Sequence, residues 1–113
     1  MRPESLRFLG INGNTLAEEG SIALGALLKK AYQLTDLHLA RTTANLDHIL
    51  PSLVNLRKIA RVNIGNNFIE NSEKIANIIE QIGINNESLE FIGLSGTKLT
   101  SQSIPIIFLV LFI

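Results

Sequence analysis

Two side chains that could do chemistry together lie two residues apart, Asp36 and His38 in the stretch LTDLHLA. Residues two apart on an extended strand point to the same side, so they could form an acid/base pair or supply two metal ligands. A metal site needs further ligands, and none is evident, because His48 is expected on the helical side of its own segment. We therefore expect no metal site and no catalytic pair, and we expect His38 to be solvated or in contact with a partner.

Other catalytic patterns lack support. The glycine-rich stretch GINGNT lacks the Gly-Lys-Ser/Thr that cradles phosphate in a P-loop, and a turn explains its glycines better. Serine, histidine and aspartate occur, but nothing in their spacing places them as a triad. The chain has no cysteine, which excludes disulfides, thiolate ligands and a thiol nucleophile. The expectation is a protein that is not an enzyme and that binds no cofactor.

Composition narrows the class of partner. Ten Lys plus Arg residues balance ten Asp plus Glu residues, so the basic surface of a nucleic-acid binder is not expected. With 113 residues, of which 46% are hydrophobic, the chain fits one domain with a modest core. The opening stretch MRPESLRFLG has no apolar run of the secretory kind, and the lack of cysteine favours a reducing compartment. We expect a cytoplasmic protein.

The polar residues sit on a pattern that recurs four times: LRFLGINGNTL, LTDLHLARTTA, IARVNIGNNFI and LEFIGLSGTKL. Each stretch has apolar residues at its first, fourth and sixth positions and Asn or Thr at its ninth. The starts lie 28, 25 and 30 residues apart, which accommodates a strand, a turn and a helix in each unit. The single domain therefore divides into units at about 6–33, 34–58, 59–88 and 89–113, the last one truncated or divergent.

Within each unit the hydrophobic period changes from that of a strand to that of a helix. Pairs of apolar residues two apart, such as Leu37 and Leu39, indicate half-buried strands. A stripe at every fourth residue then predicts a helix in the first unit, comprising Leu16, Gly20, Leu24 and Leu28. The expected fold is α/β with a parallel sheet.

Helix ends can also be predicted. Thr15 and Glu18 could form a capping box ahead of the first helix. Ser72 and Gly83 suit the start and the stop of the helix in the third unit. Pro51 lies within the second unit, so its helix is expected to be broken or reduced to a turn.

The stretch LRFLGINGNTLAEEGSIALGALL resembles a leucine-rich repeat of the ribonuclease-inhibitor-like type, and the resemblance covers nearly the whole chain. It implies a leucine-rich-repeat solenoid, a horseshoe segment with a parallel concave β-sheet and convex helices. The resemblance is weakest in the second unit, where Thr42 and Ala44 replace the expected Asn and Leu. The chain would then be part of a larger horseshoe.

The ninth position of each unit is expected to carry a structural ladder: Asn14, Thr42, Asn67 and Thr97. A buried Asn can donate and accept hydrogen bonds where the chain leaves the strand. A Thr has one hydroxyl for the same role, so the ladder is expected to be weaker in the second and fourth units.

If the apolar strand residues face the core, their neighbours form outward rows on the sheet. The first row is then Phe8, Asp36, Arg61 and Phe91, the next is Gly10, His38, Asn63 and Gly93, and the third is Asn12, Ala40, Gly65 and Ser95. The expected partner-binding patch has a polar centre flanked by two aromatic side chains, which often anchor interfaces. The residues expected to bind are Phe8, Asp36, His38, Arg61, Asn63 and Phe91. A plain surface ion pair between Asp36 and Arg61 is the alternative interpretation.

Three functions remain open. The favoured one is a non-catalytic protein-interaction module in a regulatory or scaffold protein, with a protein partner that the sequence does not identify. The resemblance offers immune sensors, actin-capping regulators and GTPase activators as settings. The alternatives are a regulator of an enzyme or small GTPase, as inhibitor or GTPase activator, and a truncated fragment without independent function.

The segment 104–113 contains no polar side chain. A helix that spans a bilayer needs about 20 apolar residues, so these ten are too few for an anchor. Aligned on the first unit, the segment takes the position of a final helix whose outward face has lost its charge. Membrane contact of this tail is not expected, and self-association through it is one alternative.

Overall fold

Four short strands form one parallel sheet in the computed structural model, which describes residues 2–97 and 99. The sheet order follows the chain, β1-β2-β3-β4. The strands are β1 (Phe8–Gly10), β2 (Asp36–His38), β3 (Arg61–Asn63) and β4 (Phe91–Gly93). The helices are α1 (Glu18–Leu28), α2 (Leu46–Ile49) and α3 (Ser72–Asn85), with 3-10 turns η1 (Pro3–Ser5) and η2 (Leu50–Leu53). The mixed α/β class and the parallel sheet are thus confirmed.

The register between strands matches the predicted outward rows. Phe8 pairs with Asp36, Asp36 with Arg61, and Arg61 with Phe91. Two residues further along, the aligned positions are Gly10, His38, Asn63 and Gly93. Because successive strand residues point to opposite faces, both rows belong to one face of the sheet.

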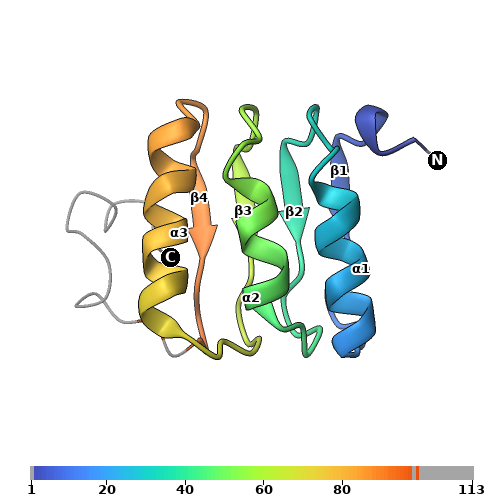
Figure 1. Cartoon of the computed structure of the whole chain (residues 1–113), viewed down its shortest axis with the longest axis vertical. Helices are drawn as coiled ribbons and strands as arrows, with labels where there is room; N and C mark the ends of the chain where they lie inside the picture. Colours follow the sequence, from blue (N-terminus) through green and yellow to red (C-terminus); the bar gives the residue numbers. More distant parts are fainter. Residues whose placement is uncertain (1, 98, 100–113) are drawn as a thin grey trace.

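All three helices lie on the other face of the sheet, each next to the strand that precedes or follows it in the chain (Figure 1). The residues between the outward rows point toward these helices and are buried, among them Leu37, Val62 and Ile92. They pack in one core with Leu28, Ile49 and other apolar helix residues. One face of the sheet is therefore covered, and no described element covers the face that carries the predicted patch, which is called the open face below.

The helix ends differ in part from the predictions. The capping box of Thr15 and Glu18 is wrong, because α1 begins at Glu18 after Ala17 and has no side-chain cap. Helix α3 begins at Ser72 as predicted, capped by the Asn71 side chain, but it continues past Gly83. The prediction for Pro51 is confirmed, since α2 gives way after four residues to η2.

Close packing of α1 on α2 depends on a glycine. A Cβ atom on Gly25 would lie 2.1 Å from the carbonyl oxygen of His48, closer than any real contact. The Ser52 hydroxyl donates to the Gly25 carbonyl at 2.6 Å and ties the same pair of segments together. Gly20, one and a half turns earlier, faces only the flexible side chain of Leu16.

We predict that Gly25→Ala lowers the free energy of unfolding by about 1–3 kcal/mol, because the methyl group forces α1 away from the His48 carbonyl. Gly20→Ala is the matched control and should leave stability unchanged or raise it by up to about 1 kcal/mol through helix propensity. Urea denaturation followed by circular dichroism measures both. Equal effects of the two substitutions would contradict the packing role of Gly25.

Candidate functional site

The open face of the sheet presents an aromatic side chain beside a group of charges. Phe8 is 60% exposed, although a phenyl ring is usually buried. Its ring lies against the His38 imidazole, with centroids 5.3 Å apart and planes tilted by 37°. Phe91 stands at the other end of the same row and is half-buried. The structure therefore brings the two predicted aromatics onto one face, with the predicted polar residues between them.

Asp36 is the centre of the charged group. Its carboxylate accepts hydrogen bonds from the Thr35 hydroxyl and from Nε of Arg61, both at 2.8 Å. The Arg61 guanidinium also pairs with Glu90 at the edge of the sheet. Although next to Phe8 in the row, the Asp36 side chain is only 14% exposed. The group is a three-member ion-pair network with one well-covered carboxylate.

These contacts favour the ionised form of Asp36. The Thr35 hydroxyl, followed by Arg61, lowers the pKa of the Asp36 carboxyl, while partial burial acts in the opposite direction. Asp36 in turn raises the pKa of Arg61.

The Nε2 atom of His38 lies 3.8 Å from the Asp36 carboxylate. Among the described residues no three His, Cys, Asp or Glu side chains gather in a way that could hold a metal ion.

A hollow of about 580 Å³ lies on the open face, toward the carboxyl ends of the strands. Its lining includes Ala40, Gly65 and Gly93, whose small size leaves the space unfilled. Asn63, one of the predicted binding residues, borders it, and its side-chain oxygen accepts a hydrogen bond from the Gly65 amide. Phe91 and Arg41 also border the hollow. Arg41 was not among the residues predicted from sequence.

Asn67 makes the main contacts where the chain leaves the sheet. Its side-chain oxygen accepts from the backbone amides of Thr42 and Ala44, both at 3.0 Å. Its amide group donates to the carbonyls of Leu39 and Ile64 at 2.6 and 3.1 Å. One side chain thus ties two successive strand exits together.

The other three ladder positions differ from Asn67. Thr42 is buried, and its hydroxyl donates to the Leu39 carbonyl. Asn14 is exposed and bonds only to carbonyls of its own turn, and the Thr97 hydroxyl likewise donates within its own turn, to Leu94. Asn67 reaches back to the preceding turn, and no described strand lies beyond β1 for Asn14 to reach.

Several buried polar residues were missed by the sequence interpretation. Asn86 caps the end of α3, accepts from the Ile59 amide and donates to the Ile82 carbonyl. Asn45 donates its backbone amide to the Ser21 hydroxyl oxygen, and its side-chain amide donates to the Glu70 carboxylate. The only sequence signal was an Asn in a turn, which does not distinguish these residues from exposed ones.

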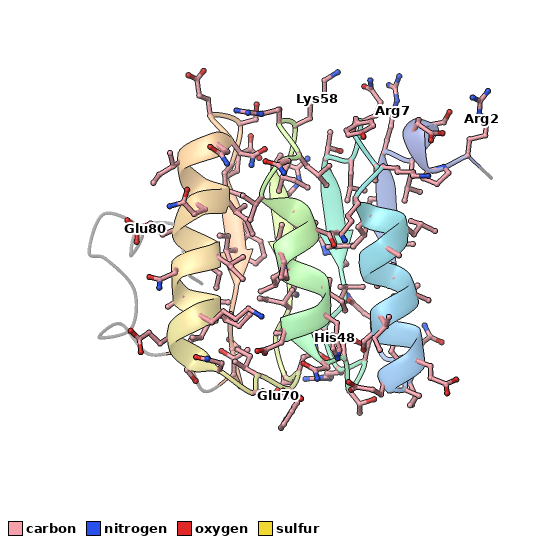
Figure 2. The ribbon with its side chains drawn as sticks, viewed as in Figure 1. Arg2, Arg7, His48, Lys58, Glu70 and Glu80 are labelled. Carbon is pink, nitrogen blue, oxygen red and sulfur yellow. The ribbon has the colours of Figure 1, made fainter. Side chains whose placement is uncertain are left out.

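A second polar cluster joins the helices at the end where α1 and α2 begin. His48 of α2 contacts the carboxylate of Glu18 at the start of α1, and this contact lowers the pKa of Glu18. Figure 2 shows His48 and Glu70 at this end of the molecule, opposite Arg7 and Lys58. The cluster links α1 to α2, and none of its residues lines the hollow.

No protein-family model matches the chain, and no curated protein resembles it significantly in sequence. In the part of the chain that the structure describes, no helix combines the length and the apolar character that crossing a membrane requires. The segment 104–113 and most of the fourth predicted unit beyond residue 97 lie outside the described residues.

We predict that Asn67→Ala lowers the free energy of unfolding by more than about 3 kcal/mol, because it leaves two amides and a carbonyl without partners in the interior. Asn14→Ala removes the same side chain from an exposed turn and should cost less than about 1 kcal/mol. Urea titration of both variants provides the comparison. A cost for Asn67→Ala as small as that for Asn14→Ala would contradict the role assigned to Asn67.

Proposed function

We propose that the chain is a segment of a leucine-rich-repeat solenoid that binds another protein through the open face of its sheet, without catalysis. The observation that carries the proposal is the row Phe8, Asp36, Arg61 and Phe91, aligned across four strands on a face that no described element covers. Exposed aromatic and arginine side chains around a polar centre are the residues that most often supply binding energy in protein interfaces.

Uniform geometry from strand to strand supports the solenoid interpretation. The fifth residue after the start of each strand has a left-handed backbone, at Gly13, Arg41, Asn66 and Gly96. The first three of these residues donate their amide to the carbonyl of the next turn along the sheet. Equal geometry at equivalent positions is what a stack of similar units produces, since each unit contacts only its neighbours.

The state of Asp36 supports binding over chemistry. A general base must accept a proton near the working pH, and a lowered pKa makes a carboxylate a poor acceptor. The Thr35 hydroxyl and Arg61 also occupy the oxygen atoms that would have to reach a substrate. The pair of Asp36 and Arg61 is suited to hold charge in a fixed place for a partner.

The absence of cysteine from the sequence is consistent with a cytoplasmic setting.

We predict that Phe8→Ala, Arg61→Ala and Phe91→Ala combined reduce the amount of partner protein recovered on the immobilised chain at least tenfold. The substitutions remove the two apolar anchors and the charge between them, and such anchors dominate binding energy. Recovery from cell extract is measured by quantitative mass spectrometry, after circular dichroism has established that the variant is folded.

The matched control changes three exposed side chains outside the open face, Ile22→Ala, Tyr32→Ala and Ile84→Ala. It removes a similar apolar area and should leave recovery unchanged. Equal recovery by the wild type and the open-face variant, or equal loss in both variants, would overturn the proposed function.

A further inference from the structure

Among the described residues, the lining of the hollow on the open face carries positive charge and no negative charge. Of the described residues that line it, Arg41 alone is charged, and the remaining polar groups come from Asn and Ser side chains. The Asp36 carboxylate, the nearest acidic group in the rows, is already paired with Arg61 and does not line the hollow. A ligand that fills the space therefore meets a cation with no competing carboxylate in its lining.

Arg41 occupies a backbone position that disfavours it. Its φ of 58° is left-handed, and the equivalent positions in the other turns carry Gly13, Asn66 and Gly96, residue types that tolerate this conformation. An arginine there is held against its own preference. The ion pairs recorded among the described residues do not include it. Backbone strain of this kind gathers at binding sites, where the surrounding structure compensates for it.

The surroundings hold the Arg41 backbone in place. Its amide donates to the Gly65 carbonyl at 3.0 Å, and the amide of Ala40 donates to the side-chain oxygen of Asn12 at 2.8 Å. The Ala40 carbonyl accepts from the Gly13 amide at 2.9 Å. These bonds hold the backbone from which the Arg41 side chain extends, so little backbone freedom is lost when the guanidinium binds a ligand.

Larger side chains at the floor of the hollow would meet backbone at Gly65 and neighbouring side chains at Gly93. A Cβ atom on Gly65 would lie 2.9 Å from the Ser95 carbonyl oxygen, and one on Gly93 would lie 2.9 Å from Oδ1 of Asn63. Both glycines are buried, so the space lies above them, with the Phe91 ring beside Gly93. An acidic side chain fits in this space beside Arg41, because a guanidinium binds a carboxylate through two parallel hydrogen bonds.

We infer that this hollow binds a glutamate or aspartate side chain of the partner protein, with Arg41 as the residue that determines this specificity. The inference rests on the proposed function, since it names the chemistry of the partner that the open face contacts. Arg41 supplies the charge, the glycine floor supplies the space, and Phe91 supplies an apolar wall for the stem of the acidic residue.

The test is titration of the full chain with end-blocked hexaglutamate, followed by nuclear magnetic resonance at the amides of Gly13, Gly65 and Gly93. End-blocked hexaglutamine is the neutral control peptide. We expect hexaglutamate to shift these amides and to bind at least fivefold more tightly than hexaglutamine. The preference should weaken as salt is raised, because the contact is exposed to solvent.

Arg41→Gly is the decisive variant, because glycine suits the left-handed backbone and the fold is retained. It should remove the preference for hexaglutamate, whereas Arg41→Lys should retain part of it. Arg57→Gly removes the same charge from a residue outside the hollow and should bind hexaglutamate as the wild type does.

Three results would overturn the inference: no shift at the hollow amides, equal binding of the two peptides, or an unchanged preference in Arg41→Gly. Inorganic phosphate serves as a further probe, and tighter binding of phosphate than of hexaglutamate would overturn the assignment to a carboxylate. If hexaglutamate fails while the open-face triple variant still loses its partner, the carboxylate assignment alone falls. If hexaglutamate binds while that variant keeps its partner, the proposed function falls instead.

Discussion

Where the chain leaves β2, Thr42 and Ala44 are buried, and their peptide groups must find hydrogen-bond partners away from water. Asn67 meets this requirement for two turns at once, since it bonds to Thr42, Ala44 and Leu39 of the preceding turn and to Ile64 of its own. A side chain that serves both turns fixes how far one strand is offset from the next. That offset sets how the residues of β2 and β3 line up on the open face.

With the offset fixed, the composition of each row determines what the face can do. The first row places the ionised Asp36 between Phe8 and Arg61, where the carboxylate is held by its neighbours. Toward the strand exits the side chains become small, and the hollow beside Arg41 opens. The same sheet therefore offers a rigid charged row and, next to it, a cavity with one cation, both of which suit the recognition of a protein surface.

The period-two pattern and the length of the units were sufficient to predict the sheet and its rows, because a slip of one residue would turn Leu37 and its counterparts outward. The partners of polar residues could not be predicted in this way. Glu18 bonds to His48 in another helix, when a local cap was expected, and Asn86 is buried by segments distant in sequence. The left-handed backbone of Arg41 follows from its place in the turn, since the residue type itself argues against it.

The alignment of the four strands determines which side chains share a row, and it can be measured through hydrogen-bond scalar couplings between amide nitrogen and carbonyl carbon nuclei. Such couplings identify both partners of each bond. The structure predicts couplings from Ile11 to His38, from Leu39 to Asn63 and from Ile64 to Gly93. Couplings from these amides to carbonyls one or two residues away would contradict the account, because Asp36, Arg61 and the aromatic residues would then no longer share one row.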